Sequence, residues 1–357
     1  MNVTVVKRPV TPGVRLGRMS FVWRPRIVLV TLLLMAATFL GFCLSIAVGD
    51  FPLSLRQVVA TLFGGGEQVD QFVIMDLRMP RALAGLVVGV ALGMSGAITQ
   101  SIARNPLASP DILGITGGAS AVAVCLVTVS GGTAAAVVST VGLSGAALAG
   151  GLATGLLVYF LAWRRGVDGF RLILIGLSVS AVMEAITTWL LVTADIRDVA
   201  RAQAWLVGSL DNRSWDEVWV ALWGTLVLAV VVACVAFQFK PLHFGDDVAA
   251  GLGVRYSLVR AVLLLCAVLL AGFAVSAAGP VPFVAMVAPQ VAIRLTKSPT
   301  PPLVASATTG ALLLIGADLV ARTVLPVSLP VSLPVGVVTA AIGGPFLIYL
   351  LVRANRR

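Results

Sequence analysis

Long apolar runs with almost no charge recur along the chain, and short segments between them hold most of the charged residues. A helix needs about 20 mostly apolar residues to cross the hydrocarbon of a bilayer. Eight runs approach or exceed this length: 27–48, 82–103, 112–162, 172–194, 218–239, 261–293, 303–320 and 335–352. The pattern therefore predicts a polytopic membrane protein whose spans are all helical.

Two of these runs are long enough to hold two helices each. Run 112–162 has a natural break at Ser130–Thr133, because the paired glycines there favour a turn. Run 261–293 is interrupted at Gly279–Pro282, where proline cannot continue a helix, so it should give one full span and one short one. We therefore expect about ten transmembrane helices in an all-α fold.

Basic residues concentrate in alternate connecting segments, and this sets the orientation. If the N-terminus is cytoplasmic, then 1–26, 163–171, 240–260 and the C-terminal tail are cytoplasmic too, and they hold most of the 25 Lys and Arg residues. Cytoplasmic loops of membrane proteins carry such an excess. We expect cytoplasmic N- and C-termini, a cytoplasmic loop at 240–258 and one transmembrane domain over 1–357.

The composition excludes several functional classes. Apolar residues make up 59% of the chain and charged residues 11%, whereas soluble domains are about a quarter charged, so a soluble enzyme is excluded. The net charge of +10 lies beside the predicted spans, which gives no reason to expect nucleic acid. The chain lacks a G-x-x-x-x-G-K-[ST] motif and has a single His, so we expect no catalytic residue, metal site or bound cofactor.

Two local patterns mark candidate binding surfaces. Arg78 and Arg81 stand on the predicted outer side, where they could meet carboxylates of a partner protein or anchor the chain at lipid phosphates. Glu184 lies in the middle of a span, where an ionisable residue is costly and commonly functional. Ser180 and Thr188 lie four residues to either side of it, so the three share a helix face that could line a water-filled path or pack between helices.

Two further patterns concern packing and docking. A stripe of small residues at Gly85, Gly89 and Gly93 indicates close packing against another helix. In the cytoplasmic loop, Gly245-Asp246-Asp247 is typical of a helix start, because acidic side chains favour the positive end of a helix. The loop could dock onto a cytoplasmic partner or lie on the bilayer as a surface helix.

Several ordered motifs together resemble the FecCD-type permeases, the membrane subunits of bacterial ABC importers for iron siderophores, haem and vitamin B12. The motifs that carry the resemblance are Leu77–Gln100, Arg104–Gly114, Trp205–Leu210, Gly245–Gly253, Ala278–Pro289, Ala317–Arg322 and Leu333–Ala340. Segments Ala162–Arg164, Phe170–Gly176 and Thr188–Leu191 are most similar to the ferric-enterobactin type, in which two different permease chains pair. The chain departs from the pattern at Gln290, where many members have His.

The resemblance implies roles that the spacing alone does not settle. Arg78, Arg81 and Arg322 would grip acidic residues of a substrate-binding protein. The cytoplasmic gate would be formed by Asn105, Pro106 and Leu107. The segment that couples to the ATPase subunits would contain Gly245, Asp246, Asp247, Gly251, Leu252 and Gly253. The fifth and tenth spans would lie near a central path.

The sequence thus predicts the permease subunit of an ABC importer in the bacterial inner membrane. The expected partners are a second FecCD-type permease chain, two ATPase subunits that bind ATP and Mg, an extracytoplasmic binding protein, and a ferric siderophore as cargo. Haem or cobalamin is the alternative cargo. A proton-coupled secondary transporter that works through Glu184 is the alternative from a different class. A membrane enzyme is disfavoured, because no nucleophile–base pair or metal cluster is evident.

Overall fold

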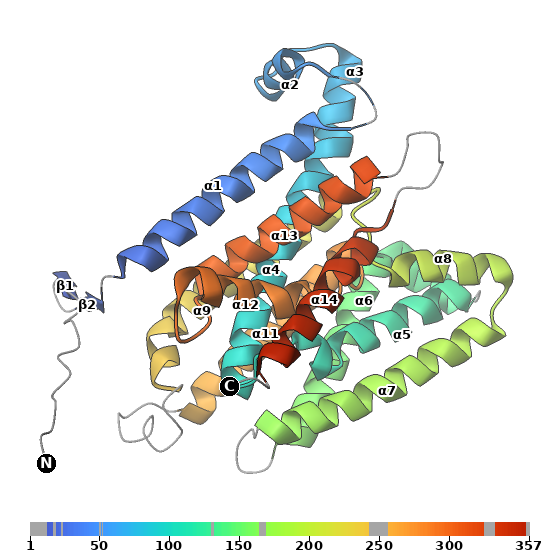
Figure 1. Cartoon of the computed structure of the whole chain (residues 1–357). Helices are drawn as coiled ribbons and strands as arrows, with labels where there is room; N and C mark the ends of the chain where they lie inside the picture. The colour runs from blue at the N-terminus through green and yellow to red at the C-terminus, as the bar shows by residue number, and fades with distance from the viewer. Residues whose placement is uncertain are drawn as a thin grey trace, which may run out of the picture.

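The computed structural model describes residues 13–16, 19–22, 24–49, 51, 53–129, 132–163, 169–242, 256–324 and 333–354, and nearly all of them lie in helices (Figure 1). The exception is a short antiparallel hairpin near the N-terminus, formed by β1 (Gly13–Leu16) and β2 (Met19–Val22). The helices that follow in the first half are α1 (Pro25–Ala47), α2 (Leu55–Leu62), α3 (Gln68–Gln71), the π-helix η1 (Phe72–Arg78), α4 (Met79–Ala103), the 3-10 helix η2 (Pro110–Leu113), α5 (Ile115–Thr128) and α6 (Gly132–Ala162). The second half holds α7 (Gly169–Thr193), α8 (Ile196–Leu206), α9 (Trp215–Leu242), α11 (Tyr256–Ala278), α12 (Val284–Thr296), α13 (Leu303–Val324) and α14 (Val335–Ala354).

The predicted spans correspond to helices. Eight helices in the described part of the chain are long and apolar enough to cross a membrane, and the shorter apolar helices α5 and α12 complete the set of ten. With 14 and 13 residues, α5 and α12 rise about 20 Å, less than the roughly 30 Å of hydrocarbon. The short second half of run 261–293 is thus confirmed, whereas α5 is shorter than the full span predicted.

The breaks between paired spans also occur where glycine and proline predict them. α5 ends at Thr128 and α6 begins at Gly132, as the sequence predicts. α6 then contains a second interruption at Gly142, whose positive φ of 74° is a conformation that glycine adopts without a steric penalty. From Val141 to Ala162, α6 is long and apolar enough to cross a membrane.

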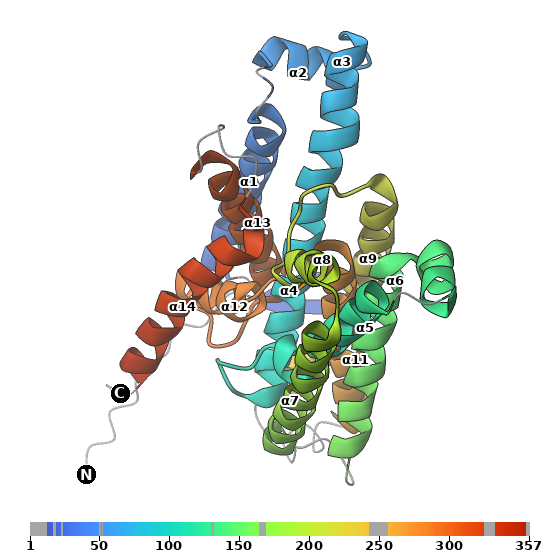
Figure 2. The same cartoon turned by 90° about the vertical axis from the view of Figure 1, so that its right-hand side faces the viewer.

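α4 is the central helix of the bundle. It packs against α9, α11, α12 and α13, and Figures 1 and 2 show it surrounded by them. The glycine stripe permits this packing: a Cβ added at Gly93 would lie 2.3 Å from the Ser306 carbonyl oxygen, and one added at Gly310 would lie 2.2 Å from that of Gly89. The backbones of α4 and α13 are therefore in contact, as small residues allow in membrane bundles.

The peripheral helices expose apolar side chains. Phe39 of α1, Trp189 of α7 and Trp223 of α9 are 69%, 65% and 57% exposed. Such surfaces are stable in contact with lipid chains or with another apolar protein surface, but not in water. The exposure agrees with a polytopic membrane protein.

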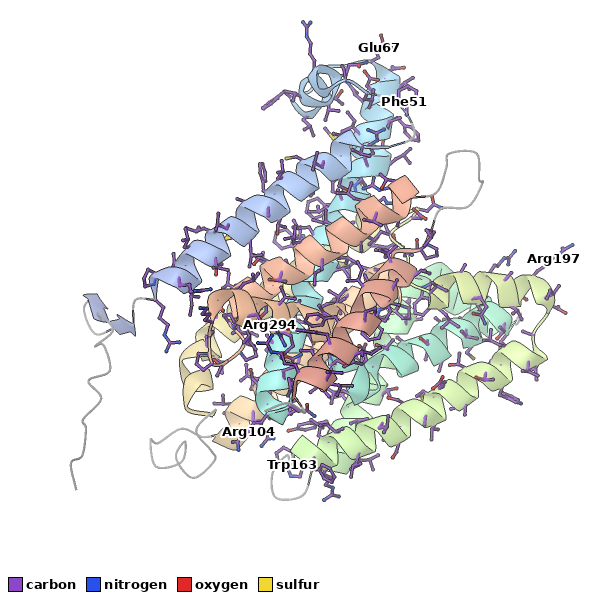
Figure 3. The ribbon with its side chains drawn as sticks, viewed as in Figure 1. Phe51, Glu67, Arg104, Trp163, Arg197 and Arg294 are labelled. Atoms are coloured by element: carbon purple, nitrogen blue, oxygen red, sulfur yellow. The ribbon has the colours of Figure 1, made fainter. Side chains whose placement is uncertain are left out.

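The two ends of the bundle differ in what they carry. Phe51 and Glu67 lie at one end, and Arg104 and Trp163 lie at the opposite end (Figure 3). Following the predicted orientation, we call these the outer end and the inner end. α1 begins at the inner end, where the Arg26 Nε donates a hydrogen bond to the Leu295 carbonyl (3.2 Å), and α14 ends there beside Arg294. The first residue of α1 and the last residue of α14 thus both lie on the predicted cytoplasmic side.

Candidate functional site

Arg78, predicted to contact a binding protein, is buried at the outer end. Its guanidinium donates hydrogen bonds to the carbonyl oxygens of Ile46 (3.0 Å), Ala47 (3.1 Å) and Phe51 (2.5 Å). The last carbonyls of a helix have no partner within the helix. Arg78 supplies donors to these groups at the end of α1 and so fixes α1 to the start of α4.

Arg81 and Arg322 are joined by a buried carboxylate. Asp318, only 2% exposed, lies 2.8 Å from a guanidinium nitrogen of each arginine. Arg81 also forms an ion pair with Asp211 in the segment between α8 and α9. Arg322 in addition donates to the Ser45 Oγ (2.6 Å) at the end of α1. We call Arg78, Arg81, Asp211, Asp318 and Arg322 together the outer charge cluster.

The outer charge cluster joins α1, α4, α13 and the segment before α9. The structure therefore brings the three predicted docking arginines together, but it gives each of them internal partners. Docking to a binding protein stays a prediction. Asp211 and Asp318 were not predicted as part of this site, although the i, i+4 spacing of Asp318 and Arg322 favours an ion pair on one helix face.

Other basic side chains at the outer end are exposed. Arg56 lies on α2 and Arg197 on α8, and both are exposed to solvent; Figure 3 shows Arg197 at the tip of α8. Arg201 is 75% exposed and has a long contact of 3.5 Å with Asp198. Sequence reasoning missed these residues, because they stand in short segments outside the motifs.

The predicted gate residues form a tight turn directly after α4. Arg104 ends the helix in the left-handed conformation (φ 50°), and the Asn105 amide donates to the Gln100 carbonyl (3.2 Å). The Asn105 side chain in turn accepts a hydrogen bond from the Leu107 amide (2.9 Å), the local bond that suits asparagine to turns. Pro106 limits the turn further, because its φ is fixed.

The next turn of this inner loop is held by Asp111, whose carboxylate accepts a hydrogen bond from the Thr116 hydroxyl (2.5 Å). Burial is the larger effect and raises the pKa of Asp111 above its usual range. The hydrogen bonds from Thr116 and Ser109 oppose this shift only in part. The loop is thereby fastened to the first turn of α5.

Two adjoining cavities open beside the gate turn. The first, of 390 Å³, lies between Pro106-Leu107, α12 and the last turn of α14. The second, of 470 Å³, lies between the end of α4, the gate turn and residues 299–301. Both are lined by Pro106, Gln290 and Ile293. We call the two together the inner vestibule.

A hydrogen-bonded chain of buried amides forms one wall of the inner vestibule. The Gln100 Nε2 donates to the Met286 carbonyl (2.9 Å), and the Gln290 Nε2 donates to the Gln100 Oε1 (2.7 Å). Arg294 donates to the Gln290 carbonyl (2.6 Å) and lies 5.4 Å from the ring centroid of Phe346 on α14. The sequence marked Gln290 only as a departure from the family pattern.

The predicted path residues on α7 do not form one exposed surface. Glu184 and Thr188 are exposed, and the Thr188 hydroxyl donates to the Glu184 carbonyl (2.9 Å). The Ser180 hydroxyl is instead buried near Gly114, and it has no hydrogen-bond partner in the described part of the chain. α7 is rotated so that Ser180 approaches η2 and α5 while the other two side chains face outward.

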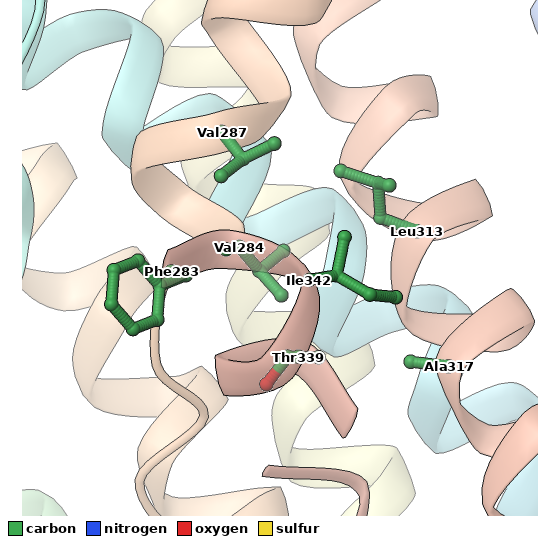
Figure 4. Close-up of a pocket in the computed structure, with 8 residues that line it drawn as sticks. Phe283, Val284, Val287, Leu313, Ala317, Thr339 and Ile342 are labelled. Atoms are coloured by element: carbon green, nitrogen blue, oxygen red, sulfur yellow. The ribbon is translucent and has the colours of Figure 1, made fainter. Parts of the chain in front are cut away.

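The remaining candidates lie outside the described residues or provide no site. Gly245, Asp246, Asp247, Gly251, Leu252 and Gly253 are outside the described residues. Within the described ranges, no group of three His, Cys, Asp or Glu side chains could hold a metal ion. A small cavity of 20 Å³ lies between α12, α13 and α14. Thr339 is the one polar side chain among the described residues that line it (Figure 4). The cavity has room for about one water and no ligand.

The chain is similar in sequence to known transport proteins. The ferric enterobactin transport system permease protein FepG of Escherichia coli (strain K12) is 38% identical over 338 residues, which cover 93% of this chain and 98% of that protein. The probable siderophore transport system permease protein YfhA of Bacillus subtilis (strain 168) is 40% identical over 335 residues, covering 92% of this chain and 95% of that protein.

The fold agrees as well. A metal-chelate type ABC transporter solved in an inward-facing conformation matches with a TM-score of 0.79 at 24% identity, over 91% of this chain and 99% of that chain. The family model described as the FecCD transport family matches residues 36–353, and that range contains the outer charge cluster, the gate turn and the inner vestibule. This polytopic membrane protein therefore belongs to the FecCD transport family.

Proposed function

We propose that the chain is the permease subunit of an ABC importer that passes a ferric siderophore from a binding protein into the cytoplasm. The observation that carries this proposal is its similarity over almost the full length to FepG, named for ferric enterobactin transport, and to YfhA, named for siderophore transport. The inner vestibule supports it, because Asn105, Pro106 and Leu107 line a space of ligand size at the predicted cytoplasmic end.

The proposal includes partners that supply energy and cargo. The chain would pair with a second FecCD-type permease chain and with two ATPase subunits that bind ATP and Mg, so it would not itself be an enzyme and would bind no cofactor. Residues 245–253 would contact the ATPase subunits. An extracytoplasmic binding protein would deliver the cargo, and the single transmembrane domain would reside in the inner membrane of a bacterium.

Docking of the binding protein would engage the outer end. For Arg81 or Arg322 to grip a carboxylate of the binding protein, that carboxylate would have to replace Asp211 or Asp318. The exposed Arg56, Arg197 and Arg201 could attract an acidic surface without such an exchange.

Reconstitution tests the proposal. The chain is co-expressed with a second FecCD-type permease chain, ATPase subunits and a binding protein encoded in the same genome, and uptake of ⁵⁵Fe-siderophore into proteoliposomes is measured with internal ATP. We expect uptake that requires the binding protein and stops with an ATPase subunit unable to hydrolyse ATP. Uptake driven by a proton gradient without ATP would contradict the proposal and favour a secondary transporter that uses the exposed Glu184.

A further inference from the structure

The short helix α2 at the outer end is held in one orientation. Ser54 caps it: the Ser54 hydroxyl accepts a hydrogen bond from the Gln57 amide (3.3 Å), and the Ser54 amide donates to the Gln57 Oε1 (3.0 Å). The Gln57 Nε2 donates in turn to a carboxylate oxygen of Asp70 on α3 (3.4 Å), which is 5% exposed. These bonds fix the start of α2 and its rotation about its own axis, so one face is always turned away from the protein.

The outward face of α2 is apolar. Val59, Leu62 and Phe63 are three and four residues apart, so they share this face, and they are 52%, 38% and 89% exposed. Phe63 is the most exposed large apolar side chain in the described part of the chain. By its spacing, the exposed Arg56 lies at the edge of the face, where its long side chain can reach water. An apolar face bordered by a basic residue is typical of helices that lie in a membrane interface. We call Val59, Leu62 and Phe63 the insertion face.

The opposite face of α2 sets its depth. Val58 is buried in one apolar cluster with Ile46 of α1, Ile74 of η1 and Ala82 of α4, and Phe42 of α1 packs against the same cluster. Ile46 belongs to the last turn of α1, and Phe42 lies one turn deeper. With 23 residues, α1 rises about 34 Å, only slightly more than the roughly 30 Å of hydrocarbon. Packing on the end of α1 therefore holds α2 at the level of the outer lipid headgroups.

An exposed apolar stripe on α1 leads to α2. Leu40, Leu44 and Val48 follow one another every four residues and are 60%, 45% and 38% exposed, and Phe51 in the linker is 46% exposed. Figures 1 and 2 show α2 next to the outer end of α1. The linker is fastened, because the Phe51 carbonyl accepts a hydrogen bond from Arg78 (2.5 Å). The insertion face thus continues an apolar surface that already belongs to a membrane-spanning helix.

We infer that α2 lies in the outer headgroup layer, with the insertion face set among phospholipid chains. The bilayer is favoured over a protein partner because α2 is held at the level of the last turns of α1, where lipid covers the neighbouring apolar stripe. A lipid-anchored α2 holds its linker, and with it Arg78, at a fixed height above the hydrocarbon. The outer charge cluster is then presented at that height. This role concerns lipid and does not depend on the cargo.

The test measures the depth of α2 with spin labels. In a chain whose four cysteines are replaced by alanine, Phe63→Cys or Glu67→Cys carries a nitroxide, and the complete importer is placed in phosphatidylcholine nanodiscs without binding protein. Collisions are measured with a nickel chelate, which stays in water, and with oxygen, which concentrates in hydrocarbon. Glu67 is exposed just before α3 and provides the matched reference. We expect the label at 63 to meet the nickel chelate roughly tenfold less often than the label at 67, since burial of large apolar side chains favours insertion by about that factor, and to meet oxygen more often.

A charge on the insertion face should expel it. Val59→Glu, added to the labelled Phe63→Cys chain, should raise nickel collisions toward the value at 67. Gln68→Glu adds the same charge to the first turn of α3, where an acidic side chain is favourable, and should leave the label as deep as before.

The outcomes separate lipid from the other possible occupants. Equal nickel collisions at 63 and 67 overturn the inference, because α2 would then stand in water. So does nickel access at 63 that is high in the free importer and falls only when binding protein is added, which would identify a protein interface. If the cysteine-free chain does not assemble, the wild-type importer is labelled with phosphatidylcholine that carries a diazirine near its glycerol backbone, and the modified residues are located by mass spectrometry. Label at residues 59–63 supports the inference, and label on α1 without label on α2 overturns it.

Discussion

Replacement of Asp318 by asparagine tests whether the outer charge cluster is a structural element. Asp318 is 2% exposed and bridges Arg81 and Arg322 at 2.8 Å each. Removing one partner of a buried ion pair costs about 3–5 kcal/mol, because the remaining charges stay buried and unpaired. The two arginine side chains are 17% and 12% exposed, so water screens them slightly, and we expect a loss near the lower limit, about 3 kcal/mol.

The assay is the free energy of unfolding of the purified permease, obtained by titrating it from mild detergent into SDS. Asp198→Asn is the matched control, because Asp198 pairs at 3.5 Å with Arg201, whose side chain is 75% exposed. Surface pairs of this kind contribute about 0–1 kcal/mol, so the control should change little. The double variant Arg81→Gln/Asp318→Asn should lose less than the sum of the two single variants, since the two side chains interact directly.

Docking is measured on the same variants. If the cluster serves only to hold the helices, binding-protein affinity per folded molecule stays unchanged in Asp318→Asn. A loss of less than about 0.5 kcal/mol in unfolding free energy, together with altered docking, would refute the structural role. It would indicate instead that Arg81 and Arg322 contact the binding protein.

Three further predictions follow from the packing, the exposed carboxylate and the outer surface. Gly93→Val should destabilise the permease by about 1–3 kcal/mol, because its side chain would meet the α13 backbone, whereas Gly316→Ala, with open space around it, should not; SDS unfolding of both variants checks this. Glu184→Gln should retain ATP-driven uptake and Glu184→Leu should reduce it, since Gln keeps the size and polarity of the exposed side chain; loss of uptake in a normally assembled Gln variant would refute this. Arg56→Glu with Arg197→Glu should weaken binding-protein docking most at low salt, where charges are least screened, and equal docking of wild type and variant at 20 and 200 mM salt would rule it out.

The sequence alone determines the architecture of this protein. Each apolar run had to become a helix, because backbone groups in hydrocarbon must find their hydrogen-bond partners within the same segment. The boundaries at Ser130–Thr133 and Gly279–Pro282 follow from the local conformations of glycine and proline, and the spacing of Gly89 and Gly93 was enough to predict close packing. These features depend on residues near one another in the chain, which is why they could be predicted.

The site residues needed the tertiary structure. Arg78 and Arg81 are on one segment in sequence, yet Arg78 is attached to the end of α1 and Arg81 to α13, more than 200 residues away. The i, i+4 spacing favours the pair of Asp318 with Arg322, but nothing local predicts that Asp318 also meets Arg81, or that Gln100 meets Gln290. The rotation that buries the Ser180 hydroxyl and exposes Glu184 is likewise set by packing of α7 on α5. Periodicity identifies which residues share a helix face, but only the arrangement of neighbouring helices decides what that face contacts.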